Sequence, residues 1–318
     1  MGVFPLFVGS GRSGTTMFGL IFDSHPDLVV THEAHFVAGL AVDYPTLLRP
    51  GGFDRRTFIE GLQANANFRR LDLPMSEVEE KLSQSNPDNF ADAVRAVFEV
   101  FAHREGKTLY GDKTPGYVNH LDLLGGLFPE AKFVHIIRDG RDVALAYVER
   151  PEWGPRTIAE AAMYWRSRVE RGRESGARLG ADRYYEVRYE ALIADAEGTV
   201  RGLCEFLGLE FHQAMLDYHK RGQTLAASTK DPQAFTALSK PPTAGLRDWR
   251  KQMAKSDIAL FEAIAGDLLV DLGYERSTSA TSLATRLRVA AAQAQWQMRR
   301  IGAKLGRTSR RLRRARTA

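Results

Sequence analysis

The 318-residue sequence contains a single cysteine, Cys204, and no apolar run long enough to cross a membrane. One cysteine excludes an internal disulfide and a cysteine-based metal site. Its place in the stretch VRGLCEFLGL predicts a buried residue on a helix rather than a reactive thiol. A membrane span needs ~18 consecutive apolar residues, and the opening VFPLFVG is also too short and too uncharged for a secretory leader. We therefore expect a cytoplasmic protein.

Acidic residues are missing from the end of the chain. Of the 44 lysines and arginines, 12 lie from Arg276 onward, where none of the 39 acidic residues lies, so the net charge of +5 divides into −7 before this point and +12 after it. Leu283, Leu287, Val289 and Trp296 fall partly on one face of a helical pattern. We expect a helical or disordered extension, with an anionic membrane surface or a partner as its next interpretation; nucleic acid is disfavoured because no known motif accompanies the charge.

The glycine loop near the N-terminus lacks the lysine of nucleotide triphosphatases. FVGSGRSGTT follows the apolar stretch VFPLFV, and Gly9 and Gly14 match the two glycines of the phosphate-binding loop. The next residues are Thr15 and Thr16, where a triphosphatase has lysine and serine or threonine. That lysine reaches the β- and γ-phosphates, and the hydroxyl holds Mg²⁺. The loop is therefore suited to an anion with less charge than a γ-phosphate.

A sulfonate fits this loop. Arg12 can clamp an oxyanion by its planar fork, and Ser13 with the two threonines adds further donors. A sulfonate ester is singly charged, so no metal is needed to mask charge. Two other classes stay open at this point: a kinase that uses ATP and Mg²⁺, and a non-catalytic nucleotide-binding protein recruited through its basic tail.

Buried strands alternate with helical patterns along most of the chain. This alternation predicts an α/β fold with a P-loop-like parallel sheet flanked by helices. We expect strands within residues 3–8, 28–31, 107–115, 131–142 and 183–192. A domain over 1–275 would then carry a mainly helical insertion at 36–105, which we expect to cover a pocket, and a basic extension at 276–318.

Two local features add detail to this outline. In NPDNFADAVRAVFEVFAHREG we expect Asn86 to cap a helix whose apolar stripe runs from Phe90 to Phe101. Residues 222–245 are rich in Thr, Ser, Pro and Lys, which is typical of a long loop of the kind that often serves as a lid.

A second anion site is indicated by FVHIIRDGRDVALAY. Arg138 follows a predicted strand at its carboxyl end, where open α/β sheets bind ligands, and Arg141 lies one turn later. Two arginines beside a helix N-terminus make a phosphate pocket. Because Asp139 and Asp142 are adjacent, a surface ion-pair motif is the alternative.

Four ordered motifs resemble a known family. FVGSGRSGTT, GDKTPGY, FVHIIRDGRDVALAY and VRYEALIADAEGTVRGLCEFLGLEF, spread over residues 4–274, are similar to sulfotransferases that use 3′-phosphoadenosine 5′-phosphosulfate (PAPS). The nearest branch is the broad bacterial-type group related to tyrosylprotein sulfotransferases. The resemblance implies a P-loop-like α/β fold and transfer of sulfonate from PAPS to an oxygen or nitrogen, with no metal.

The resemblance also implies which residues bind PAPS. The 5′-phosphosulfate falls to five loop residues: Arg12, Ser13, Gly14, Thr15 and Thr16. Arg138 corresponds to the residue that grips the 3′-phosphate, and Tyr189, with Arg188 nearby, to an adenine contact. Many members carry a serine eight residues after that arginine, where this chain has Ala146. We therefore expect Arg141 or Lys240 to supply the missing donor.

The acceptor side needs a base, and Glu33 in HPDLVVTHEAHF matches by spacing the glutamate proposed as base in tyrosylprotein sulfotransferases. His35 is the alternative, since the ordinary histidine pKa of ~6.5 suits neutral pH; His32 reads more simply as a polar residue at a strand end. Lys113 in GDKTP corresponds to a lysine near the bridging oxygen of the phosphosulfate, and Asp112 reads as a local partner. The acceptor itself stays open between carbohydrate, lipid-linked glycan, small phenol and peptidyl tyrosine.

Overall fold

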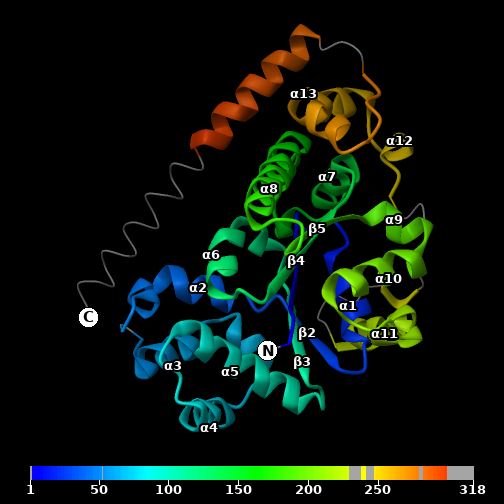
Figure 1. Cartoon of the computed structure of the whole chain (residues 1–318). Helices are drawn as coiled ribbons and strands as arrows, with labels where there is room; N and C mark the ends of the chain where they lie inside the picture. The colour runs from blue at the N-terminus through cyan, green and yellow to red at the C-terminus, as the bar shows by residue number, and fades with distance from the viewer. Residues whose placement is uncertain (1, 52, 229–237, 241–246, 279–281, 299–318) are drawn as a thin grey trace. The chain divides into compact units, whose positions relative to one another are not determined.

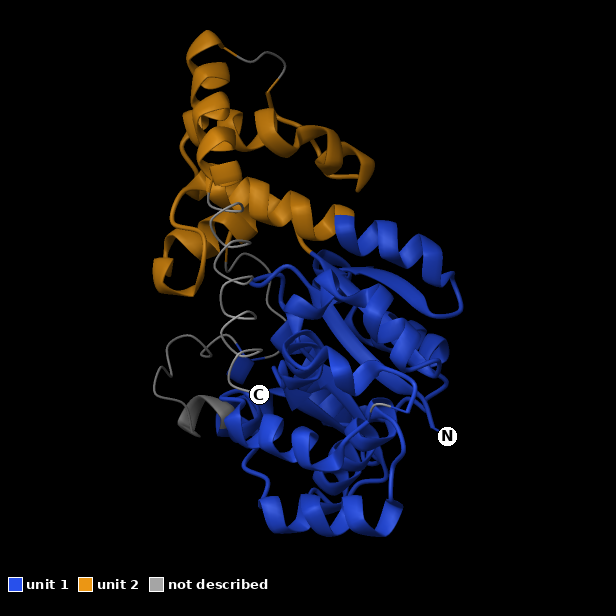
Figure 2. Cartoon of the chain, turned by 90° about the vertical axis from the view of Figure 1, so that its left-hand side faces the viewer, with its two compact units in different colours: residues 1–137, 171–246 blue, residues 138–170, 247–318 orange. Residues whose placement is uncertain are grey.

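The protein divides into two compact units in this computed structural model (Figures 1 and 2). Unit 1 comprises residues 1–137 and 171–246, and unit 2 comprises 138–170 and 247–318. The structure describes all residues except 1, 52, 229–237, 241–246, 279–281 and 299–318. This division by compactness differs from the predicted boundary near residue 275, which separates a domain from its tail.

Unit 1 is built on a parallel sheet in the order β2-β3-β1-β4-β5. Its strands are β1 (Phe4–Gly9), β2 (Leu28–His32), β3 (Leu109–Lys113), β4 (Ala131–Ile137) and β5 (Tyr184–Arg188). Each lies within or next to a range predicted from the sequence. The strand order reverses at β1, which has β3 on one side and β4 on the other, and such a switch point is where open α/β sheets bind ligands.

Helices cover both faces of this sheet. Those of unit 1 are α1 (Thr15–Asp23), α2 (Phe36–Asp43), η1 (Pro45–Leu48), α3 (Arg55–Ala64), η2 (Phe68–Leu71), α4 (Met75–Ser85), α5 (Phe90–Arg104), η3 (Pro115–Asn119), α6 (Leu121–Leu127), α9 (Tyr189–Ala194), α10 (Ala196–Leu207), η5 (Gln213–Asp217) and α11 (His219–Ser228). The insertion at 36–105 is mainly helical, as predicted, and the α/β class is confirmed.

The alternation of β1 side chains produces two apolar cores. Phe4, Leu6 and Val8 point into a cluster formed with α2 to α6, whereas Phe7 joins a second cluster with α1, α9 and α10. Successive side chains of a strand point to opposite faces, so a continuous apolar strand buries both. Cys204 lies in the second cluster and is 2% exposed, which confirms its structural role.

Two details of the expected outline are wrong. Asn86 is the C-terminal cap of α4, with a positive φ of 42°, and the N-cap of α5 is Asn89, whose side chain accepts a hydrogen bond from the amide of Asp92 at 2.9 Å. Asn86 and Asn89 lie on either side of Pro87, and only Asn89 is placed to accept a hydrogen bond from a free amide in the first turn of α5. The expected loop at 222–245 begins with the end of α11, and most of its remainder lies outside the described residues.

Unit 2 is helical. It contains α7 (Gly140–Val148), η4 (Pro151–Trp153), α12 (Trp249–Gln252), α13 (Lys255–Asp271) and a helix over residues 283–298; α8 (Ile158–Leu179) runs through both units. Trp165 and Phe261 pack over Gly140, where a Cβ would lie 2.4 Å from the Phe261 ring. Within the described residues, no helix has the length and apolar character needed to cross a membrane.

Candidate active site

The glycine loop joins β1 to α1 through a backbone with two positive φ angles. Arg12 has φ 69° and Gly14 has φ 87°. Gly14 is the N-cap of α1, and a Cβ there would lie 2.4 Å from Cδ2 of Tyr189. Glycine is therefore required twice, for the left-handed backbone and for the close ring. Left-handed residues within such a loop turn successive N–H groups toward one side and form an anion-binding concavity.

The loop supplies donors that helix geometry leaves unused. Among the described atoms, the N–H groups of Thr15 and Thr16 at the start of α1 have no backbone acceptor, whereas that of Met17 donates to the carbonyl of Gly14 at 2.9 Å; this end of the helix carries the positive end of its dipole. Ser13 is 0% exposed, and its Oγ has no hydrogen-bond partner among the described atoms. A buried hydroxyl left in this state favours a ligand that accepts its hydrogen bond.

Glu33 and Lys113 form an ion pair beside this loop. Lys113 Nζ donates to Oε1 of Glu33 at 2.9 Å, and the amide of Glu33 donates to the carbonyl of Lys113 at 2.8 Å. The lysine side chain is 3% exposed, whereas that of Glu33 is 41% exposed. The Lys113 stem lies against α1, because a Cβ on Gly19 would be 3.1 Å from its Cβ and Cγ. The ammonium is buried and the carboxylate faces solvent.

Three neighbouring strand ends bring these groups together. Lys113 is in register with Phe7 of β1 on one side and with His32 of β2 on the other. Because the strands are parallel, the glycine loop, Glu33 and Lys113 all leave the sheet at the same edge. The sequence predicted these residues as parts of one site, and the topology of unit 1 brings them to one edge of the sheet.

Two residues in the turn after β2 have a strained, left-handed backbone conformation. Glu33 has φ 55° and His35 has φ 47°, values that residues with a side chain adopt rarely. His35 Nε2 lies 3.6 Å from Oε2 of Glu33, on the oxygen that Lys113 does not use. Burial raises the pKa of Glu33, but the contacts with His35 and Lys113 outweigh it, so the pKa lies well below its ordinary value. Glu33 is thus a carboxylate at neutral pH.

Asp112 stabilises this turn through hydrogen bonds. It is fully buried, and Oδ1 accepts hydrogen bonds from Oγ1 of Thr31 at 2.6 Å and from the amide of Ala34 at 3.3 Å. Its two bonds therefore anchor the chain on either side of Glu33. Burial raises the pKa of Asp112. Only a carboxylate next to Lys113 could be seen in the sequence, because the hydrogen-bond partners of Asp112 lie about 80 residues earlier, on β2 and in the turn after it.

His32 is placed for structure rather than for catalysis. It ends β2 in register with Lys113. Burial and the nearby charge of Lys113 lower its pKa to about 4. A neutral histidine at a strand end agrees with its simpler interpretation from the sequence.

The two arginines of the second motif have different environments in unit 2. Arg141 is 0% exposed; its Nε and Nη2 donate to the two carboxylate oxygens of Asp139 at 3.0 and 2.8 Å, and Nη1 donates to Glu262 at 2.7 Å. Its guanidinium also lies 3.5 Å from the ring centroid of Trp249. These contacts occupy the guanidinium of Arg141, which makes it a structural residue and not the substitute phosphate donor that we expected. Arg138 has a 3.4 Å contact with Asp142 and remains the candidate.

The remaining residues discussed for the donor site are placed as follows. Ala146 is buried on α7 at 1% exposure and has no hydroxyl to offer. Lys240 has an exposed side chain, and its carbonyl accepts a hydrogen bond from Tyr218 Oη at 2.9 Å. Tyr189 begins α9 directly after Arg188 and is 8% exposed, with its ring on Gly14.

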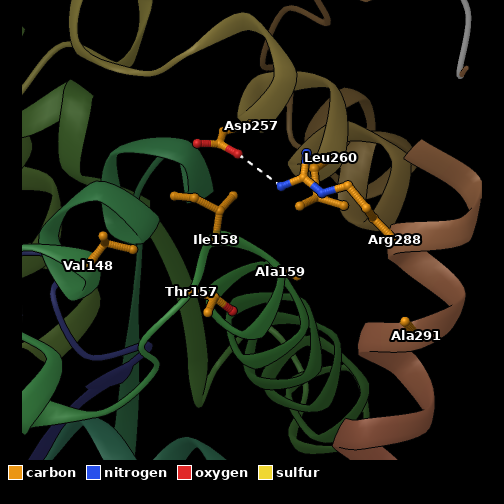
Figure 3. A pocket seen from close by; sticks show the side chains of 8 residues that line it. All are labelled: Val148, Thr157, Ile158, Ala159, Asp257, Leu260, Arg288 and Ala291. Carbon is orange, nitrogen blue, oxygen red and sulfur yellow. Dashed lines mark hydrogen bonds and ion pairs between the residues drawn. The ribbon is translucent and has the colours of Figure 1, made fainter. Parts of the chain in front are cut away.

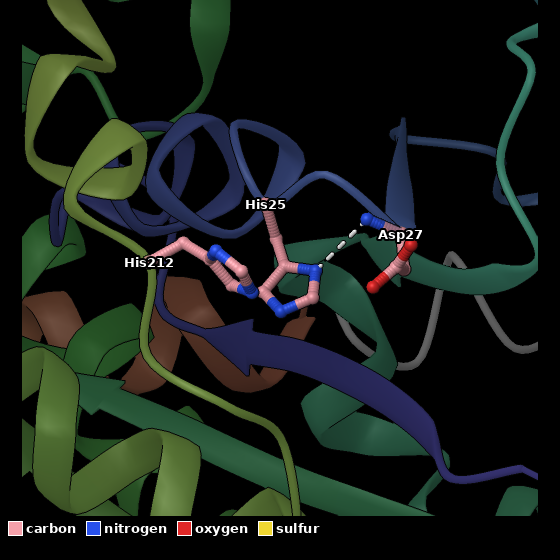
Figure 4. Close-up of side chains that lie close together, drawn as sticks. All are labelled: His25, Asp27 and His212. Carbon is pink, nitrogen blue, oxygen red and sulfur yellow. Dashed lines mark hydrogen bonds between the residues drawn. The ribbon is translucent and has the colours of Figure 1, made fainter.

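One histidine cluster outside this site has the composition of a metal centre but not its chemistry. His25, Asp27 and His212 lie close together in unit 1 (Figure 4). His25 Nδ1 accepts the amide of Asp27 at 3.0 Å, and Nε2 lies 3.1 Å from the carbonyl oxygen of Glu210 and so carries the proton. Both ring nitrogens of His25 are used in hydrogen bonds, so His25 has no lone pair left for a metal. The cluster fastens the turn after α1 to the segment after α10.

A cavity in unit 2 is also unsuited to the chemistry. Its volume is about 430 Å³, and its walls include Val148, Ile158 and Leu260 (Figure 3). The charged groups in it are Asp257 and Arg288, which pair with each other at 3.3 Å. Among the described residues that line it, no carboxylate or histidine is left without a partner.

Comparisons with known proteins identify the family of this chain. The sulfotransferase family model matches residues 5–213. The chain is 27% identical over 282 residues to a candidate protein-tyrosine sulfotransferase of Caenorhabditis briggsae, covering 86% of this chain and 90% of that protein. It is 23% identical over 282 residues to protein-tyrosine sulfotransferase 1 of Danio rerio, covering 85% and 72%.

A solved structure shares the fold. The sulfotransferase domain of the Synechococcus PCC 7002 olefin synthase superposes with a TM-score of 0.59 at 24% identity, covering 86% of this chain and 94% of that domain. The family match decides between the classes that the glycine loop alone left open, in favour of sulfotransfer and against the ATP-dependent kinase. The chain belongs to the sulfotransferase family, as its four ordered motifs predicted.

Proposed function

We propose that this enzyme transfers sulfonate from PAPS to a phenolic hydroxyl, with Glu33 as the base. The observation that carries the proposal is the Glu33–Lys113 pair at 2.9 Å, at the sheet edge where the glycine loop begins. This pair places the ionised carboxylate of Glu33, which can accept a proton, next to the buried ammonium of Lys113 in unit 1. PAPS supplies an activated sulfonate whose acceptance by oxygen leaves adenosine 3′,5′-diphosphate.

The residues present fit this donor. The buried Ser13 hydroxyl, the left-handed loop and the N-terminus of α1 provide neutral donors for a singly charged group, and Arg12 adds one positive charge. We assign the 5′ end of the donor to the loop residues 12–16 and the 3′-phosphate to Arg138. Tyr189 is proposed for the adenine because its ring already lies on the loop at Gly14.

Glu33 is favoured over His35 as the base by its charge state. A carboxylate with a lowered pKa is ionised at all physiological pH values and always available. Because it is a weak base, it takes the proton late, as the new O–S bond forms and the hydroxyl becomes acidic. His35, 3.6 Å away, orients the second carboxylate oxygen in this scheme.

Lys113 balances charge on the opposite side of the reaction. Its ammonium is buried and has Glu33 as its hydrogen-bonded partner. We propose that it stabilises negative charge on the departing phosphate, a role that a preorganised cation fills well in a poorly hydrated site. Protonation of Glu33 during transfer weakens its attraction for Lys113, which frees the ammonium for the leaving group.

A phenol is proposed as acceptor because of the relatives and the base. The curated relatives at 27% and 23% identity are named for protein-tyrosine sulfotransfer. A phenol, with a pKa near ~10, releases its proton to a carboxylate far more readily than an alcohol does. The helical insertion at 36–105, which follows Glu33 directly, is the proposed acceptor side.

The donor assignment is tested by thermal shift with adenosine 3′,5′-diphosphate, AMP and ATP, each with EDTA or with Mg²⁺. We expect stabilisation by the 3′,5′-diphosphate that EDTA does not change; a ligand at ~100 times its dissociation constant adds about 2.7 kcal/mol. Arg12→Ala should abolish this shift. Stabilisation only by ATP with Mg²⁺ would refute the donor.

The base is tested by turnover with PAPS and a panel of p-nitrophenol, a tyrosine peptide and a simple sugar. Glu33→Gln should lower kcat at least ~10²-fold and leave the affinity for the 3′,5′-diphosphate unchanged. Wild-type kcat should stay level from pH 8 to pH 6, since a histidine base would lose activity there. An active Glu33→Gln variant beside an inactive His35→Ala variant would transfer the role to His35. Turnover of the sugar alone would overturn the phenol.

A further inference from the structure

Residues 283–298, called the tail helix below, turn one face inward and another to solvent. Thr285 is buried, and Val289 and Trp296 are half-buried, on the inner side. Leu283 and Leu287 are 73% and 64% exposed. The sequence pattern placed these two leucines on the same face as Val289 and Trp296, and the structure corrects this: the tail helix has two separate apolar faces.

The outer face of the tail helix is apolar throughout. At 3.6 residues per turn, one arc of about 100° holds six exposed apolar residues: Ala290, Leu283, Ala294, Leu287, Met298 and Ala291. Met298 is 66% exposed. Arg286, Gln293 and Gln297 border this arc on one side. A continuous apolar stripe on a solvent-exposed surface marks an interaction site.

The charge of the same segment indicates the kind of partner. From Arg276 onward the chain has 12 basic residues and no acidic one, and nine of the 12 follow the tail helix in RRIGAKLGRTSRRLRRARTA. The partner must therefore be anionic and must also accept an apolar stripe. Nucleic acid answers the first requirement but not the second.

We propose that the tail helix and the basic segment after it bind an anionic phospholipid surface. The helix lies in the plane of the interface with Leu283, Leu287 and Met298 among the acyl chains, and the arginines contact the headgroups. Amphipathic helices with basic polar sides bind membranes in this way, by buried apolar area together with attraction to anionic lipid. The tail helix therefore rests on a bilayer rather than spanning it, and the protein is peripheral at the membrane.

The test is co-sedimentation of the full chain with vesicles of phosphatidylcholine alone or mixed with phosphatidylglycerol. We expect binding to the mixed vesicles only, and weaker binding as salt is raised. Leu283→Asn together with Leu287→Asn should weaken binding on the order of ten-fold without changing charge. Val270→Asn is the matched control, since Val270 is a single hydrophobic residue, 55% exposed, on α13.

Three outcomes would overturn the proposal. The first is no binding of the wild-type chain to mixed vesicles at low salt. The second is equal binding by the Leu283→Asn/Leu287→Asn chain, which would leave charge alone as the cause. The third is retention on single-stranded RNA without vesicle binding, which would assign the tail to nucleic acid. Unchanged thermal unfolding and unchanged stabilisation by adenosine 3′,5′-diphosphate show that each variant is folded.

Discussion

His135 makes the stability of the sheet depend on acid in a predictable way. It lies on β4 at 0% exposure, and Nδ1 is 2.6 Å from Tyr184 Oη. Because that hydroxyl donates to Glu186 at 2.9 Å, it accepts from His135, so Nδ1 carries the proton. Nε2 has no hydrogen-bond partner among the described atoms. Burial, and then the charge of Arg173, lower the pKa of His135 to about 3.

The magnitude follows from the difference between the folded and unfolded chains. The unfolded histidine has the ordinary pKa of 6.5 and the folded one a pKa of about 3. Between these values only the unfolded chain binds the proton, so the free energy of unfolding falls as pH falls through this window. From pH 7 to pH 5 the loss from this one group is about 2 kcal/mol.

The perturbation is His135→Asn, whose amide nitrogen branches where Nδ1 does and keeps the donor to Tyr184. Urea unfolding is followed by far-ultraviolet circular dichroism at pH 8, 7 and 5. The variant should lose about 2 kcal/mol less than the wild type between pH 7 and pH 5. Both chains should change almost equally between pH 8 and pH 7, where the folded histidine is neutral and the unfolded one mostly so. An equal loss between pH 7 and pH 5 would refute a neutral buried His135.

Three further predictions concern the site. Gly14→Ala should abolish stabilisation by adenosine 3′,5′-diphosphate, because its Cβ would lie 2.4 Å from the Tyr189 ring; Gly51→Ala, with φ 66° and nothing within 4 Å, is the matched control and should bind normally. Asp112→Asn should lower kcat with little change in donor affinity, since the turn holding Glu33 loosens, and steady-state kinetics with unaltered kcat would contradict this. Arg141→Lys should lower the free energy of unfolding by about 3 kcal/mol while donor affinity in the thermal shift stays normal; lost affinity in a fully stable variant would restore Arg141 as a phosphate ligand.

The fold was readable from the sequence where burial is strong and local. VFPLFV is apolar on both sides because β1 contributes to two cores at once, and Gly9, which follows this stretch, ends the strand. The cap of α5 was misplaced because Asn86 and Asn89 are both good capping residues, and only the position of the amide of Asp92 distinguishes them. Compact units cannot be read from residue patterns, since they depend on contacts between segments distant in sequence.

The site was readable where a motif is contiguous and unreadable where a side chain is shared. The loop and Glu33 carry their chemistry in local sequence. Arg141 has the same local pattern as a phosphate ligand, but Glu262, 121 residues away, takes one of its donors. Asp112 is likewise engaged by distant partners, which lie on β2 and in the turn after it.

The lysine that the glycine loop lacks has a counterpart in the fold. In a triphosphatase the cation stands on the helix that follows the loop, whereas here Lys113 comes from β3 and lies along α1 at Gly19. Its charge is already balanced by Glu33 at 2.9 Å. A singly charged sulfonate suits such a balanced site better than a triphosphate, which needs the extra positive charge of a lysine and Mg²⁺. The position of Lys113 on a strand also places it next to the proposed base, so in the proposed mechanism one hydrogen bond couples proton acceptance by Glu33 to charge stabilisation by Lys113.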